Sequence, residues 1–559
     1  MSGQADKDIK RALLSPRSVA LIGASGDEAK NTARPLHYLR QHGFKGGVFP
    51  INPGRGEVLG EKAWPNLKSA TMAAGGPIDH AYVMVPRDAV PGVIADCAEA
   101  GVAVASIYSD GFAEAGEEGV KFQHDMVSAA RAGGVRILGP NSMGVVNVHA
   151  GLSLTTNAGL EVPELVPGPF SVISQSGTAL GGLLSRGQDR GFGFSKLLSI
   201  GNESDLSVGE VVNFLVDDPD TGAILLFLET LRRADDLAQA ARRAYGAGKP
   251  VIAYKLGRSD AGQRMAASHS GAMAGPDEAA TAFFRHHGIL RIDTLEALLE
   301  TPFLVMGRAP AAGAGHEPKR VAILTTTGGG AAMVVDRLGL AGIDFAEAPD
   351  AVIERLGPLG IRVGNSPVID VTMVGARADV YGPTVTDLIE DAGNDAVICV
   401  VGSSAQLRPD VAVSPIIALG RSTKPLAVFC VPEAGESLKV LSEAGIAGFR
   451  TPESCADAVC ACLNWARPAP EAARDLPQGV MALLEGATNP RLDERAALAV
   501  FEALGVAPAH HRVLQPGEAV PDDIAYPVAA KVLSADIAHK TEAGGVILEI
   551  PDADALKHA

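Results

Sequence analysis

Short apolar runs that end in glycine or polar turns recur along this chain, and stretches with helical spacing separate them. Strands that alternate with helices in this way form parallel βαβ units. We therefore predict a doubly wound α/β domain over residues 1–148. Its expected strands lie in SVALIGASG (18–26), GGVFPINP (46–53), HAYVMVP (80–86), VAVASIYSDG (102–111) and RILGPNSMG (136–144).

The same pattern of strand, glycine turn and helix returns twice. FSVISQSGTALGGLLSRG (170–187) indicates a second α/β domain over 149–312, and RVAILTTTGGGAAMVVDRLG (320–339) indicates a third over 313–470. Pro/Gly-rich linkers precede both of these runs. Further strands are expected in SKLLSIGN (195–202), AILLFLET (223–230), PVIAYKLG (250–257), DAVICVVGSS (395–404) and PLAVFCVPE (425–433).

The last part of the chain, 471–559, has a different pattern. LDERAALAVFEALGVA (492–507) predicts an amphipathic helix, and PVAAKV (527–532) predicts a strand that carries Lys531 in an otherwise apolar run. A lysine at this position can reach water from an edge strand or bind an anionic ligand, and the pattern leaves both open.

Composition narrows the class of protein. A chain of 559 residues is too long for one core, and 47% hydrophobic with only 4% aromatic residues indicates cores of Ala, Val, Leu and Ile, as in buried parallel sheets. A net charge of −17 argues against nucleic acid and membrane surfaces as partners. The polar start and the absence of an apolar run of about 20 residues predict a cytoplasmic protein.

Six cysteines do not make a disulfide framework. Cys455, Cys460 and Cys462 have the spacing C-x4-C-x-C, which fits no common zinc pattern. Because Cys455 and Cys462 share one face of an expected helix, we interpret them as core residues and predict no metal site.

The turn Gly23-Ala24-Ser25-Gly26 follows the first strand, at the expected start of a helix near Lys30. Backbone N–H groups at such a turn bind phosphate, so NAD is the first candidate ligand. However, the second strand ends in FPINPG, without the acidic residue that holds a ribose 2′-OH. Coenzyme A therefore fits better than NAD.

His269 stands among small residues in MAASHSGAMAG (265–275), a stretch that predicts a loop. A histidine there can be an ordinary turn residue or a nucleophile that carries a group between two reactions. The carboxyl ends of parallel strands meet at one edge of a sheet, so polar residues that follow the strands of the second domain are expected to converge with it. These residues are Ser174, Ser176, Asn202 and Glu229.

The order of motifs resembles the ADP-forming acyl-CoA synthetases, relatives of succinyl-CoA synthetase. The matching stretches are SVALIGAS, FPINP, YVMVPRDAVPGVIADCAEAGV, YSDGFAEAGEEG, RILGPNSMGVVN, ISQSGTAL, FLETLR, SHSGAMAG, TTTGGGAAM and KVLSADIAHKTEAGGV, over about residues 15 to 550. The resemblance implies a Rossmann-like CoA-binding domain, two flavodoxin-like domains of the succinyl-CoA-synthetase type and part of an ATP-grasp domain over 471–559.

The resemblance also implies roles for single residues. His269 would become phosphorylated, Glu229 would orient its ring, and His539 would relay phosphate from a distant nucleotide site; His539 can equally be a loop histidine in solvent. Phosphoryl binding at helix starts is implied for Ser174, Ser176, Gly177, Gly328, Gly329 and Gly330. CoA binding is implied for Gly23, Ser25, Pro50, Asn52, Pro53 and Asn141, and nucleotide binding for Lys531.

The implied reaction joins a small carboxylic acid to CoA, with ATP giving ADP and phosphate, through an acyl phosphate and a phosphohistidine. The hinge and the acidic Mg²⁺ ligands of an ATP-grasp domain should follow Lys531 and are absent, so we expect either a truncated sequence or a partner chain that completes the module. A homo-oligomer is also expected.

Two other functions stay open beside this one. A non-catalytic regulator that binds CoA or acyl-CoA would explain the incomplete nucleotide module, and an NAD-dependent dehydrogenase would use the same first turn. The strand end FPINPG argues against the dehydrogenase.

Overall fold

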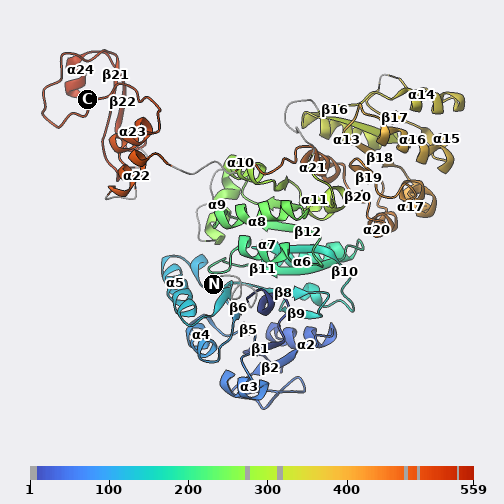
Figure 1. The fold of residues 1–559 in the computed structure, drawn as a ribbon, viewed down its shortest axis with the longest axis horizontal. Helices are drawn as coiled ribbons and strands as arrows, with labels where there is room; N and C mark the ends of the chain where they lie inside the picture. The colour runs from blue at the N-terminus through green and yellow to red at the C-terminus, as the bar shows by residue number, and fades with distance from the viewer. Residues whose placement is uncertain are drawn as a thin grey trace. The chain divides into compact units, whose positions relative to one another are not determined.

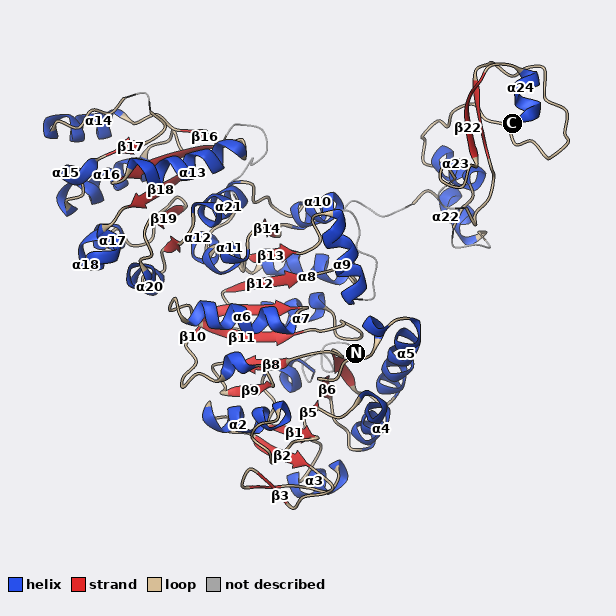
Figure 2. Ribbon diagram, turned by 180° about the vertical axis from the view of Figure 1, so that it is seen from behind, coloured by secondary structure: helices blue, strands red, loops and turns tan. Residues whose placement is uncertain are grey.

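The computed structural model describes residues 9–270, 277–310, 319–364, 366–470, 476–487, 491–537 and 540–559, without the side chains of 267–270 and 373–374. The chain divides into two compact units, Met1–Ala469 and Pro470–Ala559. Figure 1 shows the course of the chain, and Figure 2 marks its helices and strands. Among the described residues, no helix is long and apolar enough to cross a membrane.

The first sheet contains all five strands expected between residues 18 and 144. They are β1 (Ser18–Ile22), β2 (Gly47–Ile51), β5 (His80–Val83), β6 (Val104–Ile107) and β7 (Arg136–Leu138). They run parallel in the order β2-β1-β5-β6-β7, with helices α2 (Arg34–Gln41), α3 (Leu67–Ala74), α4 (Val90–Glu99) and α5 (Glu117–Ala132) between them. The predicted doubly wound pattern is confirmed. A short hairpin, β3 (Glu57–Val58) and β4 (Glu61–Lys62), follows β2.

The helix after the first turn begins later than predicted. We expected it from Lys30, but α2 starts at Arg34, after a single 3-10 turn, η1 (Asn31–Ala33). Pro35 fits the first turn of a helix because its missing N–H needs no partner there, so it favours a start at this point. The Gly23–Gly26 turn therefore does not lie directly at the start of an α-helix.

The second sheet has seven strands in the order β14-β13-β12-β10-β11-β8-β9. Strands β10 (Pro167–Ser174), β11 (Phe194–Ser199), β12 (Ala223–Leu228), β13 (Val251–Lys255) and β14 (Leu290–Ile292) are parallel. β8 (Gly144–Asn147) and β9 (Leu152–Thr155) form an antiparallel edge on β11, and sequence reasoning missed both.

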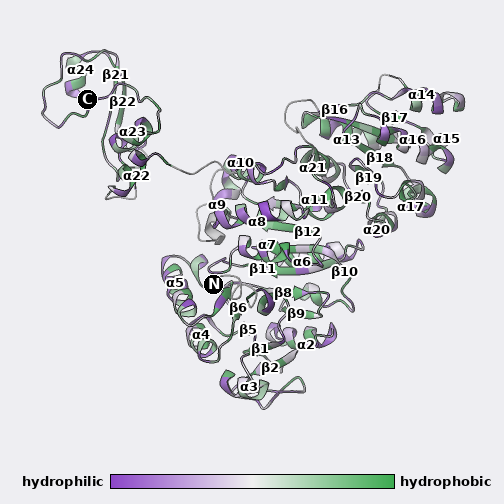
Figure 3. Cartoon of the chain, in the orientation of Figure 1, coloured by the Kyte–Doolittle hydropathy of each residue, from purple (hydrophilic) through white to green (hydrophobic). Residues whose placement is uncertain are grey.

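The helices of this sheet follow its strands in chain order. They are α6 (Gly177–Gln188), α7 (Val208–Val216), α8 (Ala234–Gly246), α9 (Asp260–Ser270), α10 (Asp277–His287), α11 (Leu295–Glu300) and α12 (Pro302–Val305). α7 starts with a reciprocal capping box between Ser207 and Glu210 and is buried on nearly all sides. Accordingly, Figure 3 colours it among the most hydrophobic helices of the chain.

The third sheet has the order β16-β15-β18-β19-β20, with β17 paired to β15. Its strands are β15 (Arg320–Thr325), β16 (Asp344–Phe345), β17 (Ile369–Asp370), β18 (Ala396–Val401), β19 (Leu426–Cys430) and β20 (Ala447–Phe449). Its main helices are α13 (Gly328–Leu340), α14 (Asp350–Leu356), α16 (Ala378–Glu390), α20 (Gly435–Glu443) and α21 (Pro452–Leu463). The short helices are α15 (Thr372–Gly375), α17 (Ser404–Leu407), α18 (Pro409–Ala412) and α19 (Ser414–Ile417).

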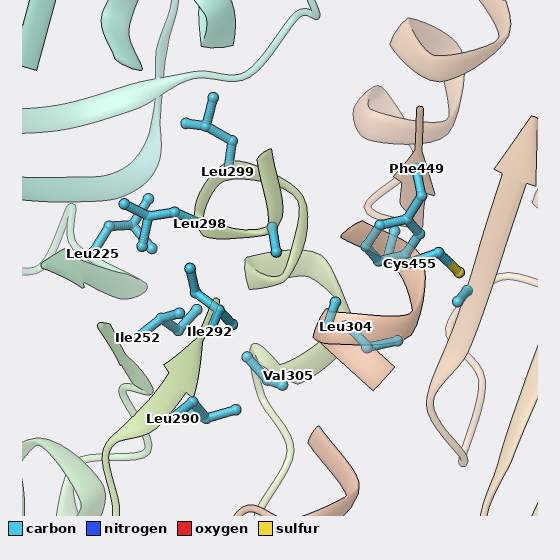
Figure 4. Close-up of a cluster of buried hydrophobic side chains, with 14 of the residues drawn as sticks. Leu225, Ile252, Leu290, Ile292, Leu298, Leu299, Leu304, Val305, Phe449 and Cys455 are labelled. Carbon is cyan, nitrogen blue, oxygen red and sulfur yellow. The ribbon is translucent and has the colours of Figure 1, made fainter. Parts of the chain in front are cut away.

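The second and third sheets share one hydrophobic core. Figure 4 shows Leu225 of the second sheet and Leu298 of α11 on one side of this cluster, Phe449 and Cys455 of the third domain on the other, and Leu304 of α12 between them. Cys455 is fully buried on α21, which confirms its predicted helix and core position, whereas Cys462, for which we made the same prediction, is only half-buried, as is Cys460. All six cysteines are free.

The second unit is small. It contains α22 (Gln478–Glu485), α23 (Glu494–Ala503), α24 (Ala553–His558) and an antiparallel pair of strands, β21 (Val528–Lys531) and β22 (Val546–Ile550). The predicted helix and strand are both confirmed. Val480 and Ile550 are its buried hydrophobic residues among those described, while Ile547 and Leu548 are exposed.

Candidate active site

The carboxyl edge of the second sheet gathers the polar residues that follow its strands. Ser174 ends β10, Asn202 follows β11, and Glu229 follows β12. In Figure 2 the arrows of β12 and β13 point toward the side on which α9 lies. Because these strands are parallel neighbours, the structure brings the three residues to the same edge, as predicted from the sequence.

The turn after β10 is held by its own hydroxyl groups. Ser174 Oγ donates to the carbonyl oxygen of Ser176 at 2.6 Å, and Ser176 N donates back to Ser174 Oγ at 3.1 Å. Ser176 caps α6 by accepting from Ala179 N at 3.4 Å, and Gly177 is the first residue of the helix. The N-terminus of a twelve-residue helix therefore lies at this edge, where it favours an anion.

Gln175, between these two serines, is a residue that sequence reasoning missed. Its side chain is nearly buried, and its Oε1 accepts from Glu229 N at 2.6 Å and from Thr230 N at 2.9 Å. Its Nε2 donates to Thr230 O at 3.0 Å and to Glu203 Oε2 at 2.8 Å. The first β–α turn of this domain is thus tied to the backbone of the candidate catalytic glutamate.

Glu203 is a second buried carboxyl at this edge. It has a φ of 53°, uncommon for a residue with a side chain, and its Oε1 accepts from Val208 N at 2.8 Å. Burial raises the pKa of Glu203, against its hydrogen bonds to Val208 and Gln175 and the positive charges of Arg232 and Arg233.

The edge also contacts the first domain. Asn202 Nδ2 donates to Gln123 Oε1 at 3.0 Å and to a carboxylate oxygen of Glu114. Glu114 lies in η3 (Ala113–Ala115), and α9 packs against this same turn. In Figures 1 and 2, α9 and α5 accordingly lie on the same side of the molecule.

Arg232 provides positive charge in this network. Burial lowers the pKa of Arg232, while the nearby carboxylates of Glu203, Glu114 and Glu229 act in the opposite direction. One guanidinium therefore faces carboxylates that come from two domains. A cation in this position suits a site that must accept further negative charge.

His269 lies within α9, whose backbone continues to Ser270, so the first half of the expected loop 265–275 is helical. This part of the loop prediction is wrong, because small residues such as Ala266 and Ala267 favour helix as readily as turn. The side chain of His269 lies outside the described residues, and so does His539.

Residues predicted to bind CoA lie around the first turn of the chain. Gly23 has a φ of 86°, and a Cβ there would lie 3.0 Å from Met84 O, so a side chain is excluded. Asn52 Nδ2 donates to Ala24 O at 3.0 Å, which joins the loop after β2, where Pro53 also lies, to this turn; Pro50 lies within β2 itself. Ser25 Oγ accepts from Asp27 N at 3.0 Å.

Asn141 follows β7 and has a φ of 57°. Its N–H donates to Ser109 O at 2.9 Å, and the preceding Pro140 O accepts from Asn202 N at 2.9 Å. A Cβ on Gly201 would collide with that same carbonyl oxygen. The turn that carries Asn141 is therefore seated on the candidate active-site edge of the second domain.

Gly328, Gly329 and Gly330 begin α13 at the carboxyl end of β15. The neighbours that surround them belong to the third domain: a Cβ on Gly328 would lie 3.3 Å from Asp370 Oδ2, and one on Gly330 would meet Val400 and Val431. These glycines thus occupy in the third sheet the position that Ser176 and Gly177 occupy in the second.

Lys531 lines an open cavity of about 770 Å³ in the second unit. Its Nζ donates to Glu494 Oε1 at 2.8 Å, and Lys540 Nζ donates to Glu494 Oε2 at 3.0 Å. These two hydrogen bonds lower the pKa of Glu494. Lys531 is therefore paired in a cavity together with a second lysine, an arrangement that can receive phosphate groups.

Among the residues that the structure describes, no group of three or more His, Cys, Asp and Glu side chains has the geometry to hold a metal ion. The acidic residues around the second unit's cavity do not form such a group. No metal-dependent step can therefore be derived from these residues.

Three family models match the chain in order. A CoA binding domain matches residues 17–148, a succinyl-CoA ligase like flavodoxin domain matches 167–304, and an ATP-grasp domain matches 483–559.

Relatives match over most of the length. A trans-feruloyl-CoA synthase from an unknown prokaryotic organism is 32% identical over 98% of this chain and 78% of its own length. The alpha subunit of the ADP-forming acetate–CoA ligase II of Pyrococcus furiosus is 32% identical over 81% of this chain and 97% of its own. A solved acetyl-coenzyme A synthetase 1 of Ca. Korarchaeum cryptofilum, in complex with phosphate and ADP, has a TM-score of 0.71 at 30% identity over 82% of this chain and 97% of that one.

Proposed function

Because the chain belongs to the family of ADP-forming acyl-CoA ligases, we propose that it joins a carboxylic acid to CoA while ATP is converted to ADP and phosphate. Its relatives are enzymes of the acid–thiol ligase type. The observation that carries the proposal is a relative, a feruloyl-CoA synthase, that is 32% identical over 98% of this chain. The order of the three matched domains supports it.

His269 is the proposed nucleophile. In the direction of acyl-CoA synthesis, a ring nitrogen of His269 attacks the phosphorus of the phosphoryl group that His539 carries, the P–N bond to His539 breaks, and phospho-His269 forms. Glu229 accepts a hydrogen bond from the other ring nitrogen, which fixes the tautomer and stabilises the positive charge that develops on the ring. The support for this pair is the place of Glu229 at the edge where α9 follows β13.

The second step uses the acid. A carboxylate oxygen of the substrate attacks the phosphorus of phospho-His269, the P–N bond breaks, and an acyl phosphate forms. The N-terminus of α6, with Ser174, Ser176 and Gly177, stabilises the phosphoryl group by about 0.3–1 kcal/mol when exposed and up to about 2 kcal/mol when partly buried. Gly328, Gly329 and Gly330 at the start of α13 are proposed for the same work.

The third step uses CoA. Its sulfur attacks the carbonyl carbon of the acyl phosphate as the thiol proton leaves, the C–O bond breaks, and phosphate departs with acyl-CoA. CoA is proposed to lie along the turn of Gly23 and Ser25 and along the end of β2 and its following loop, which contain Pro50, Asn52 and Pro53. Asn141 would guide its thiol end toward the second domain, since its turn is seated on Asn202.

The nucleotide is proposed to bind in the cavity of the second unit. Lys531 and Lys540 would leave Glu494 for the phosphates. A ring nitrogen of His539 would attack the terminal phosphorus as ADP leaves, and the phosphoryl group would then pass from His539 to His269. Mg²⁺, when bound, would neutralise the phosphate oxygens; because the described residues do not provide a ligand set for it, we derive no step through it.

We further propose a partner chain that contributes to the nucleotide site. This proposal is supported by two relatives of this chain, both from Pyrococcus furiosus, that are named alpha subunits of ADP-forming acetate–CoA ligases. A homo-oligomer of the first unit is compatible with the same arrangement. The class of substrate is a small carboxylic acid.

Labelling with phosphate tests the proposal. Full-length protein incubated with acetyl-CoA and labelled inorganic phosphate, without nucleotide, should form a phosphoramidate that is labile to acid and stable to alkali. His269→Ala should abolish the label, whereas His539→Ala should leave it intact. A label that survives His269→Ala would place the nucleophile elsewhere.

The choice of acyl group needs its own control, because the substrate acid is not fixed. Feruloyl-CoA and 4-hydroxybutyryl-CoA, chosen after the names of two relatives, should be run beside acetyl-CoA. If none of them gives a label although calorimetry detects CoA binding, the non-catalytic CoA-binding regulator becomes the better reading.

A further inference from the structure

We propose that Gln175 is a positioning residue for Glu229, and that a hydrogen bond to Glu203 holds the amide of Gln175 in place. This inference rests on the proposed function, because it concerns the carboxylate that would orient His269. It assigns a specific task to a buried side chain of the α6 turn that does not itself touch the reacting groups.

The hydrogen bonds of Gln175 use the whole capacity of its amide. Oε1 accepts from two consecutive backbone N–H groups, those of Glu229 and Thr230, and Nε2 donates to Thr230 O and to Glu203 Oε2. The reverse orientation of the amide would set its NH₂ group against two N–H donors, so the network itself fixes the orientation. The amide is therefore held from four directions.

The hydrogen bonds of Gln175 take the place of strand pairing beyond the end of β12. β12 ends at Leu228, and Glu229 and Thr230 lie beyond the paired part of the sheet. There the side chain of Gln175 pairs with Thr230 N and Thr230 O, as the backbone of a neighbouring strand would. Because this pairing fixes the backbone of Glu229, it also fixes the direction in which the Glu229 side chain leaves the chain.

Glu203 links Gln175 to the start of α7. Its Oε2 receives the Nε2 hydrogen bond of Gln175, and its Oε1 receives Val208 N at the start of α7. Arg232 and Arg233 place positive charge near Glu203. Arg232 also lies near the carboxylates of Glu229 and of Glu114, which belongs to the first domain. A carboxylate placed at 175 would therefore lie directly against Glu203.

Labelling of the full-length protein from acyl-CoA and phosphate tests the inference. Gln175→Met keeps the size of the side chain but removes its acceptor. The initial labelling rate should fall by about ten- to a hundred-fold, and the KM for acyl-CoA should stay within about two-fold. Gln188→Met, at the other end of α6, is the matched control and should label at the wild-type rate.

A double-mutant cycle separates positioning from general packing. If Gln175 acts through Glu229, then Gln175→Met should cost less than about three-fold in a Glu229→Gln background. Losses that multiply in the double variant, or an unchanged rate in Gln175→Met, would overturn the inference. A wild-type protein that takes no label would instead overturn the proposed function, and no variant result resembles that outcome.

An exchange of the two side chains guards against a variant that fails to fold. Gln175→Glu alone sets two carboxyl groups 2.8 Å apart, so labelling should be retained near pH 5.5, where they share a proton, and lost toward pH 8. Combining it with Glu203→Gln restores one N–H donor between the two positions and should rescue labelling at pH 8 in part, because the bond from position 175 to Thr230 O stays lost. A double variant as impaired as Gln175→Glu, with an unchanged circular dichroism spectrum, would contradict the pairing.

Discussion

Glu300 gives the interface between the second and third domains a predictable dependence on pH. It ends α11 and is almost wholly buried, and its carboxylate accepts from Ser454 Oγ of α21 at 2.6 Å and from Arg190 at 3.0 Å. Arg190 is shared with Glu296. The effect of burial on the pKa of Glu300 is larger than the opposing effects of Ser454 and Arg190. Burial therefore raises this pKa from 4.5 to about 7.

The sign and the size follow from this pKa. Between pH 4.5 and about 7 the folded protein holds a proton on Glu300 that the unfolded chain has released, so stability falls as the pH rises through this window. The difference between the two pKa values corresponds to about 3 kcal/mol. Glu300→Gln keeps one acceptor oxygen for Arg190 and turns an amide NH₂ group toward the hydroxyl oxygen of Ser454. Because this side chain cannot ionise, the variant should lose the contribution of Glu300 to the pH dependence.

The interface contains its own reporter. Trp465 is nearly buried and donates from Nε1 to Gly288 O at 2.9 Å, and the chain has two tryptophans, so Trp64→Phe leaves Trp465 as the fluorophore. Urea unfolding at pH 5 and pH 8 should show a lower midpoint at pH 8, and Glu300→Gln should reduce that difference. Asp457, whose pKa burial raises to about 6, contributes equally to both proteins.

A second carboxyl group serves as the control. Glu296→Gln removes a partly exposed partner of the same Arg190 and should leave the pH dependence in place. Equal shifts of the midpoint in the parent protein and in Glu300→Gln would refute the reasoning, because they would show that Glu300 is already ionised in the folded state.

Three further predictions concern the other sites. Calorimetry on the full chain should detect binding of CoA and none of NAD, and Asn52→Ala should weaken CoA binding by roughly ten-fold, because it frees the loop after β2 from the first turn; tight NAD binding would contradict this. Lys531→Ala should weaken ATP binding by at least about ten-fold, whereas Lys557→Ala, an exposed lysine on α24, should leave it unchanged; equal affinities of all three proteins would remove Lys531 from the site. Backbone amides of 491–537 should exchange hydrogen faster than those of β12, because the described residues of the second unit bury only two hydrophobic side chains, Val480 and Ile550. Uniformly slow exchange would show that this unit has an independent core.

The sequence predicted most of the sheets because their signals are local. An apolar run such as AILLFL, followed by a polar turn, can be recognised as a strand from fewer than ten residues. Because Glu229 comes directly after this run, its place at the carboxyl edge of the sheet follows from the sequence alone. The strands that were missed are short or pair with distant residues. β14 and β20 have three residues each, too few for periodicity, and β8 pairs with β11 about fifty residues later.

The polar network at the site could not be predicted for a related reason. Gln175 looks like any residue of a glycine-rich turn, and its task depends on backbone groups 54 and 55 positions away. Glu203 lies in the polar stretch Gly201-Asn202-Glu203-Ser204-Asp205, which is typical of a loop, and only the structure shows that it is buried. A resemblance to a family names the residues that react, whereas those that hold them are identified by contacts.

The seam between the first two domains restricts how this sequence can change. Gly201 must stay without a side chain because of Pro140 O, and Asn202 is bound to Glu114 and Gln123 at the same time. Drift at any of these positions is therefore tied to the others, although they lie about eighty residues apart. We therefore expect the first two domains to change together in evolution: a first domain borrowed from a relative would fit here only if residues 201 and 202 came with it.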